Sequence, residues 1–109
     1  MSKQLNFTYN GQDYCLEFTR RSVEMMERNG FVASEVRDKP MLTLPALFAG
    51  AFLAHHRFIK QDLVKEIFDH MTNKQELIGK LAEMYNEPIN ALVSDPDGDE
   101  GNVSWTASW

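Results

Sequence analysis

The residues of this chain that could do chemistry are few, and their spacing suits neither a metal nor a nucleophile. The histidines are His55, His56 and His70. His55 and His56 are adjacent, so on a helix their side chains point about 100° apart and cannot chelate one ion together. No HExxH or CxxC motif supplies the tetrahedral ligand set that zinc needs. We therefore expect His55 and His56 to form a pair at a helix end, where the helix dipole favours protonation.

Two further patterns could suggest an active or metal site. Cys15 is the single cysteine, which excludes an internal disulfide and fits a reducing cytoplasm. A catalytic thiol needs a lowered pKa and an orienting histidine, and the sequence places neither beside Cys15. The acidic run 95–100 fails as a calcium loop, because Glu100 and Thr106 stand where glycine and the bidentate glutamate belong. We expect no enzyme, no cofactor and no metal.

Charge and hydropathy restrict the partners. The chain has 11 basic and 16 acidic residues, a net charge of −5, so it lacks the positive excess that neutralises phosphates. A local cluster of Arg20, Arg21 and Arg28 leaves a nucleic-acid-binding regulator as the least favoured alternative among the binding proteins. The apolar run 41–54 is shorter than the roughly twenty residues that span a bilayer. With no signal peptide in the sequence, we expect a cytoplasmic protein that binds neither nucleic acid nor membrane.

A β-hairpin over residues 4–18 is predicted by alternating apolar and polar residues around Asn10-Gly11. This dipeptide suits a type I′ turn, because both of its positions need positive φ. The turn pairs Tyr9 with Gln12, Phe7 with Tyr14, and Leu5 with Leu16. The opposite face, with Asn6, Cys15 and Glu17, is expected to be wet. A lone hairpin is marginal in water, so its apolar face must rest on helices.

Four helices are predicted after the hairpin, at about residues 20–29, 44–57, 61–71 and 74–93. Thr19 is the expected N-cap of the first helix. The second should start near Thr43 with Pro45 in its first turn, and should be buried because it is apolar on nearly every face. The fourth has a capping-box pattern at Asn73 and Glu76.

A break is expected inside the last of these ranges, because Pro88 suits the first turn of a separate short helix. The predicted fold class is therefore α+β and mostly α. Residues 1–93 form one globular domain, in which the N-terminal β-hairpin packs on a bundle of about four helices. Residues 94–109 form an acidic, mobile C-terminal tail.

Trp105 and Trp109 stand in this polar tail without a local core. Tryptophan is enriched among interface hot spots, so the pair predicts rings that fold back on the body of the protein, an anchor to a partner, or the end of a disordered tail. The residues assigned to a candidate client or self-association surface are Phe48, Phe52, His55, Phe68, Met71, Trp105 and Trp109.

Three segments within about residues 3–93 carry a family likeness: LNFTYNGQDYCLEFTRRSVEMMERNGF, LPALFAGAFLAHHR and NKQELIGKLAEMYNEPINAL. They resemble the small tail assembly chaperones of long-tailed bacteriophages and prophages, which are encoded beside the tape measure protein. The chain would correspond to the short form of such a chaperone. The resemblance implies no catalytic residues.

The resemblance implies a non-enzymatic viral protein that binds the tape measure protein and helps to recruit tail tube subunits. It would act in the host bacterial cytoplasm and be absent from the mature virion. An apolar client patch needs cover between clients, so a homo-oligomer is expected. The hairpin edge over residues 5–9 could add a strand to a neighbour, because no proline protects it. The alternative is a small structural tail or connector protein.

Overall fold

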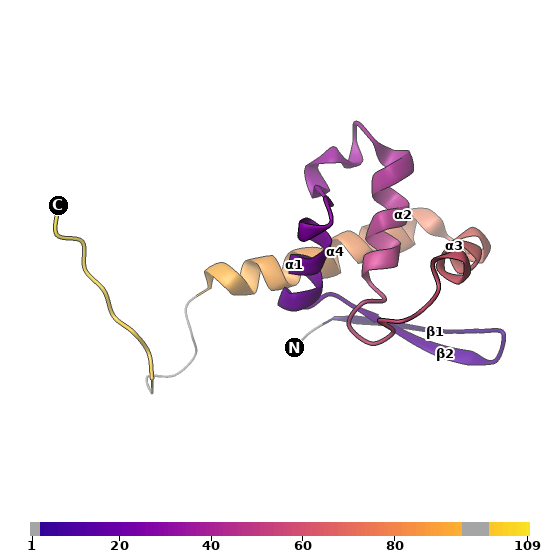
Figure 1. The fold of residues 1–109 in the computed structure, drawn as a ribbon, viewed down its shortest axis with the longest axis horizontal. Coiled ribbons are helices and arrows are strands. Elements are labelled where there is room, and N and C mark those ends of the chain that lie inside the picture. Colours follow the sequence, from indigo (N-terminus) through magenta and orange to yellow (C-terminus); the bar gives the residue numbers. More distant parts are fainter. Residues whose placement is uncertain (1–2, 95–100) are drawn as a thin grey trace.

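The structure is a computed structural model that describes residues 3–94 and 101–109 of the chain. The hairpin lies along one side of the helices (Figure 1). The elements in chain order are β1 (Gln4–Tyr9), β2 (Gln12–Glu17), α1 (Arg20–Arg28), the short 3₁₀ helix η1 (Ala33–Val36), α2 (Pro40–Gly50), α3 (Gln61–His70) and α4 (Lys74–Val93). The predicted α+β, mostly α, fold class is confirmed. Residues 101–109 contain no helix or strand, and residues 95–100 of the predicted tail lie outside the described residues.

The hairpin has the predicted turn and register. Asn10 and Gly11 have φ values of 49° and 78°, as a type I′ turn requires. The antiparallel pairs include Leu5 with Leu16 and Phe7 with Tyr14. The two-stranded sheet therefore presents one apolar face.

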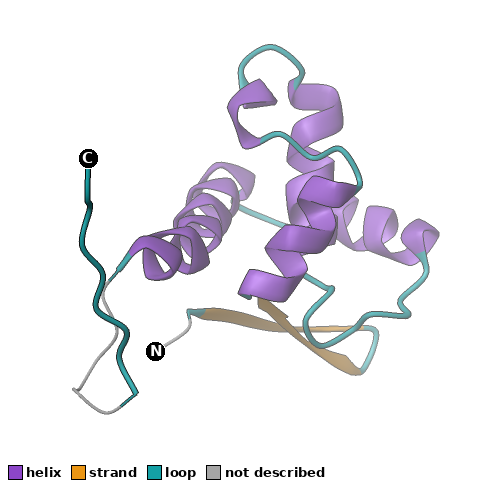
Figure 2. Cartoon of the chain, turned by 60° about the vertical axis from the view of Figure 1, so that its left-hand side comes forward, coloured by secondary structure: helices purple, strands orange, loops and turns teal. Residues whose placement is uncertain are grey.

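That apolar face rests on the helical core, as Figure 2 shows from a second side. Phe7 stacks on Tyr14, with 5.3 Å between ring centroids. Both rings meet Phe52 edge-on, at 6.4 Å and 5.9 Å. The largest fully buried side chains are Phe48, Phe52, Leu16, Ile67 and Leu81. Because these residues come from β2, α3, α4 and the region of α2, one core joins the hairpin to the bundle.

Helix α1 begins with a capping box. The Ser22 N–H donates to the Thr19 hydroxyl oxygen at 3.1 Å, and the Thr19 N–H donates to the Ser22 hydroxyl oxygen at 2.8 Å. At its other end Gly30 has a φ of 94°, and the Phe31 N–H donates to the Met26 carbonyl at 3.0 Å. The predicted N-cap at Thr19 is confirmed.

The predicted second helix, 44–57, is wrong at both ends. Helix α2 begins earlier, because Pro40 takes a place in its first turn, where a missing N–H breaks no bond. Pro45 therefore lies inside the helix. The helix is also not buried throughout: Met41 and Leu42, in its first turn, are 87% and 72% exposed.

The early end of α2 has a tertiary cause. In a continuing helix the Ala51 carbonyl would accept the His55 N–H. Instead it accepts the Glu17 N–H from β2, at 3.0 Å. The chain after Gly50 then passes into a series of turns. A backbone bond to the hairpin thus replaces a bond of the helix.

The last two helices agree better with the prediction. Helix α3 ends at His70, and α4 fills the predicted range 74–93. The expected break at Pro88 is wrong, because α4 is continuous and the Pro88 ring is buried within it. This burial compensates for the backbone hydrogen bond that proline cannot make. The expected capping box is also wrong: the Asn73 side-chain amide donates to the Glu76 carboxylate and not to the backbone.

None of the helices in the described part of the chain is long and apolar enough to cross a bilayer.

Candidate functional site

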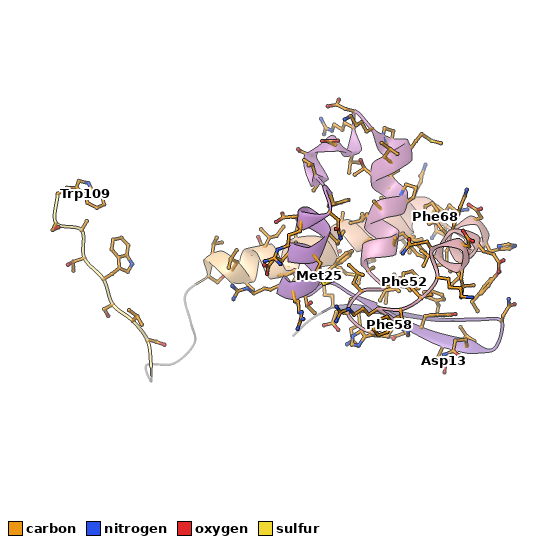
Figure 3. All side chains as sticks on the ribbon, in the orientation of Figure 1. Asp13, Met25, Phe52, Phe58, Phe68 and Trp109 are labelled. Atoms are coloured by element: carbon orange, nitrogen blue, oxygen red, sulfur yellow. The ribbon has the colours of Figure 1, made fainter. Side chains whose placement is uncertain are left out.

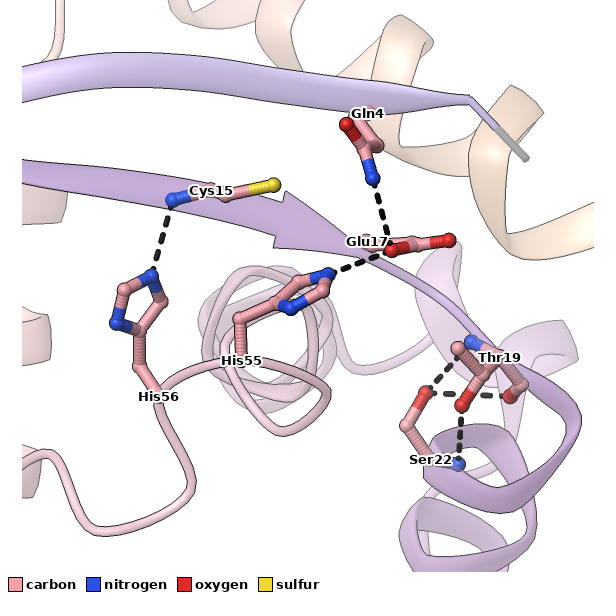
Figure 4. A network of polar contacts seen from close by, with 7 residues as sticks. All are labelled: Gln4, Cys15, Glu17, Thr19, Ser22, His55 and His56. Carbon is pink, nitrogen blue, oxygen red and sulfur yellow. Dashed lines mark hydrogen bonds and ion pairs between the residues drawn. The ribbon is translucent and has the colours of Figure 1, made fainter. Parts of the chain in front are cut away.

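The outer edge of β2 is covered by residues 51–56, which we call the edge loop. The Glu17 N–H donates to the Ala51 carbonyl at 3.0 Å. The Cys15 N–H donates to Nε2 of His56, also at 3.0 Å (Figure 4). Both N–H groups point away from β1, since bonding alternates along an antiparallel pair. The chain thus covers one edge of its own sheet beside Cys15 and Glu17.

Glu17 is held at the centre of this contact. Its Oε1 lies 2.6 Å from Nε2 of His55 and accepts the Gln4 side-chain amide at 3.2 Å (Figure 4). The expectation of a wet hairpin face is wrong for Glu17, because the edge loop buries it to 7% exposure. The expectation of a helix-end histidine pair is also wrong, since α2 ends at Gly50 and His55 and His56 lie in the edge loop.

The His56 ring is fixed in its neutral form by its surroundings. Nε2 accepts a hydrogen bond, so it carries no proton in this arrangement. Burial lowers the pKa of His56, and the neighbouring His55 charge lowers it further. The Tyr14 ring packs edge-on against the imidazole at 5.2 Å. His56 therefore acts as a hydrogen-bond acceptor near neutral pH.

Cys15 and His56 are not arranged as a nucleophile and its base. His56 bonds to the main chain of Cys15 and not to its thiol. Burial raises the pKa of the Cys15 thiol, and the Glu17 charge raises it further, so the unreactive protonated form is favoured. The shallow hollow of about 460 Å³ beside them is lined by Asn6, Phe7, Thr8, Asp13, Tyr14, Cys15, His55 and His56.

No group of three or more His, Cys, Asp or Glu residues within 3–94 and 101–109 could hold a metal ion. His70 lies elsewhere, with its Nδ1 2.9 Å from the Glu66 carbonyl and its ring 5.9 Å from that of Tyr9. The acidic run that was compared with a calcium loop falls outside the described residues.

Exposed apolar side chains gather at two places on the helices. The last turns of α4 carry Ile89, Leu92 and Val93, which lie beside a groove of about 370 Å³ between α1 and α4. The first turn of α2 carries Met41 and Leu42. Leu42 lines a larger groove, of about 600 Å³, formed by the end of α1, η1 and α2. We call these the α4 patch and the α2 patch.

A third exposed apolar group lies in residues 103–109. Trp105 is 79% exposed and Trp109 is fully exposed. Figure 3 shows that Trp109 lies far from the helices. Val103 is exposed in the same way. Exposed apolar side chains that gather in one segment are typical of a surface that binds a partner.

A comparison with protein-family models relates this architecture to a known group. The model of DUF5055, a domain of unknown function, matches residues 1–109. The chain belongs to the DUF5055 family. No curated protein and no solved structure matches it. The DUF5055 description names no activity, so the function of this chain must be argued from its own surfaces.

The residues that the sequence assigned to a client surface of this DUF5055 chain fall into separate places. Phe48 and Phe52 are 0% and 1% exposed, so they belong to the core and cannot meet a client in this conformation. Phe68 packs on Phe48 at 5.0 Å between ring centroids. Met71 also packs against the core. Phe68 and Met71 are only partly buried, and His55, Trp105 and Trp109 are exposed.

The α4 and α2 patches were missed by that assignment. Ile89, Leu92 and Val93 continue the apolar stripe of α4, and the stripe alone does not reveal where α1 stops covering it.

The arginine cluster is also less basic than its sequence suggests. Arg28 forms an ion pair with Glu24 on the same helix, which reduces its availability to a phosphate.

Proposed function

We propose that this DUF5055 protein is a non-enzymatic tail assembly chaperone of a long-tailed phage or prophage. In this proposal it binds the tape measure protein, helps to recruit tail tube subunits, works in the host bacterial cytoplasm and is absent from the virion. The observation that carries the proposal is the exposure of large apolar side chains at the α4 patch and the α2 patch. The likeness of three sequence segments to such chaperones supplies the client.

The α4 patch suits an apolar helical client. Its groove has an apolar floor that includes Val23, Pro88 and Leu92, and a charged rim that includes Arg20 and Glu24. An amphipathic helix binds such a groove through residues spaced three and four apart. Each large apolar side chain that becomes buried contributes about 1.5–3 kcal/mol. A few such contacts with a long client are enough for reversible coating.

The α2 patch offers a second, wider groove. Its wall contains the small residues Ala46 and Ala49, which leave room for another helix, whereas Gly50 is already covered by the Met26 side chain. Leu42 and Val32 supply larger exposed apolar surface at its margin. Two grooves on one small protein favour an extended client over a compact one. Self-association between clients covers the same surfaces.

The first experiment is co-expression with fragments of the tape measure protein. We expect the protein to keep these fragments soluble and to co-purify with them. Leu92→Asp in the α4 patch should abolish this effect while the circular dichroism spectrum keeps its helical signal. The matched control is Asn86→Asp, which adds the same charge at an exposed position of the same helix. Equal precipitation of the fragments with and without the protein would contradict the proposal.

The protein composition of purified tails distinguishes a chaperone from a structural tail component. Mass spectrometry of finished particles should find the tape measure protein and the tail tube protein without this chain. A constant number of copies of this chain in each particle would identify it as a structural component.

A further inference from the structure

Backbone groups on the outer edge of β1 have no hydrogen-bond partner among the described residues. Beside a two-residue turn the flanking pair, Tyr9 and Gln12, is hydrogen-bonded, and bonded pairs then alternate with non-bonded ones. No residue within 3–94 and 101–109 bonds to the backbone groups that point outward from β1. These are the N–H and C=O groups of Gln4, Asn6 and Thr8. The sheet is thus closed at β2 by the edge loop and open at β1.

The apolar side chains of the sheet are also less well covered on β1 than on β2. On β2, Tyr14 and Leu16 are buried, whereas their β1 partners Phe7 and Leu5 stay partly exposed. Tyr9 is partly exposed in the same way. A further strand beside β1 would cover these side chains. Its sequence would need apolar residues at every second position.

Residues 103–109 have this sequence. They read VSWTASW, in which Val103, Trp105, Ala107 and Trp109 alternate with Ser104, Thr106 and Ser108. Valine, tryptophan and threonine favour strands, and the segment contains neither proline nor glycine. It has no secondary structure in this conformation and its tryptophans are exposed. Its sequence pattern is that of a β-strand, although it pairs with no other strand in the described part of the chain.

An antiparallel register that satisfies both faces is available. Placing Thr106 opposite Asn6 puts polar residues against polar residues and apolar residues against apolar ones. The apolar pairs are Trp105 with Phe7, Val103 with Tyr9, and Ala107 with Leu5. Lys3 then lies opposite Trp109, a favourable pairing of a cation with an aromatic ring. No like charges meet, and a shift of one residue would put both tryptophans on the polar face.

Chain length favours a strand that comes from a second copy of the protein. Lys3 Nζ lies 2.7 Å from Glu83, so β1 starts beside the middle of α4. The end of α4 is roughly 15 Å further along the helix axis. Figure 1 shows the hairpin turn on the opposite side of the molecule from that end. An antiparallel strand must enter at the turn, about 20 Å beyond the start of β1. Ten Cα–Cα steps join Val93 to Val103 and span at most about 33–36 Å, so residues 103–109 could reach β1 of their own copy only across a fully extended linker. A strand from a second copy has no such constraint.

We infer that residues 103–109 of one copy pair as an antiparallel third strand with the β1 edge of a second copy. The inference concerns contacts between copies and goes beyond the binding of a client. The edge supplies backbone hydrogen bonds, and the alternating tryptophans supply apolar burial and register. Each copy then offers one donor strand and one acceptor edge.

Tryptophan fluorescence tests this inference directly, because both tryptophans of the chain lie in residues 103–109. For the full-length protein we expect emission at shorter wavelength at high concentration and a shift to longer wavelength on dilution. Sedimentation should show dissociation over the same concentrations. A solvent-exposed spectrum at every concentration would overturn the inference. A buried spectrum that does not change on dilution of a monomer would also overturn it, because the tail would then dock within one copy.

Two full-length variants separate the donor strand from the acceptor edge. Asn6→Pro removes an outward N–H that bonds to none of the residues that the structure describes, and edge strands tolerate proline. Trp105→Ala weakens the donor strand, and Ser104→Ala on its polar face is the matched control. Each of the first two variants should raise the dissociation constant by at least about tenfold, with an unchanged circular dichroism spectrum.

Mixing the two variants gives the decisive result. Asn6→Pro keeps an intact donor strand and Trp105→Ala keeps an intact edge, so together they should form a 1:1 complex that neither forms alone. Failure of the mixture to associate, in proteins that are both folded, would overturn the strand exchange.

Discussion

His56 accepts a hydrogen bond from the backbone N–H of Cys15, at 3.0 Å and across 41 positions of the sequence. With the bond from Glu17 to Ala51, it joins the edge loop to β2. The acceptor is a titratable ring, so one of the two hydrogen bonds that cover this sheet edge depends on the protonation of a side chain. His55, Cys15, Tyr14 and Phe52 surround that ring.

The stability of the protein should therefore depend on pH through His56. Its folded pKa is lowered, mainly by burial, below the unfolded value of about 6.5. Above that pH both states are neutral and the hydrogen bond contributes its full stability. As pH falls below it, the unfolded chain takes up the proton first, so the free energy of unfolding declines. Urea titrations of wild type between pH 7.5 and pH 5.5 should show this decline.

The variant His56→Gln isolates this effect. It should lower the free energy of unfolding by about 1 kcal/mol at pH 7.5, the usual contribution of a hydrogen bond. The difference from wild type should shrink as the pH falls. His70→Gln, at an exposed histidine, should keep the pH dependence of wild type. An unchanged pH slope in His56→Gln would show that another group is responsible.

Two phenylalanines distinguish the core from the surface with the same substitution. Phe48→Ala should destabilise the fold by about 3–5 kcal/mol, because the side chain is fully buried among Phe52 and Phe68. Phe58→Ala should change stability by less than about 0.5 kcal/mol, since that ring is 91% exposed. Thermal unfolding followed by circular dichroism measures both. Similar melting temperatures for the two variants would contradict this core assignment.

Two glycines should respond to alanine in opposite directions. Gly11 has a φ of 78° in the hairpin turn, so Gly11→Ala introduces strain and should destabilise the fold by about 1 kcal/mol. Gly79 lies within α4 with no atom close to the position of an added Cβ. Gly79→Ala should therefore stabilise the protein by about 0.5–1 kcal/mol. Chemical denaturation of the two variants checks the sign of each change.

Local signals predicted the hairpin and three of the four helix positions. Asn10-Gly11 determines both turn type and register, and Thr19 caps α1 through atoms within one turn. Helix α2 could not be placed in this way. Pro40 and Pro45 both suit a first turn, and local chemistry does not choose between them. Its end depends on a hydrogen bond from Glu17, which is distant in sequence.

The candidate surface was harder to predict for a similar reason. The periodicity of a helix identifies its apolar stripe but not the length of that stripe which neighbours cover. Phe48 and Phe52 are apolar in the same way as Leu92, yet they are buried and Leu92 is 58% exposed. Exposure of this kind depends on how α1 and α4 overlap. Trp105 and Trp109 were recognised because the polar sequence around them leaves no core for them to join.

The covered edge of β2 has a consequence for polymerisation. A sheet with two open edges can recruit strands without limit, which is the route to fibrils. Here the edge loop removes one growth point from each copy, so further strands can join the sheet only on the β1 side. A variant that loosens the edge loop would expose a second growth point and would be more prone to polymerise.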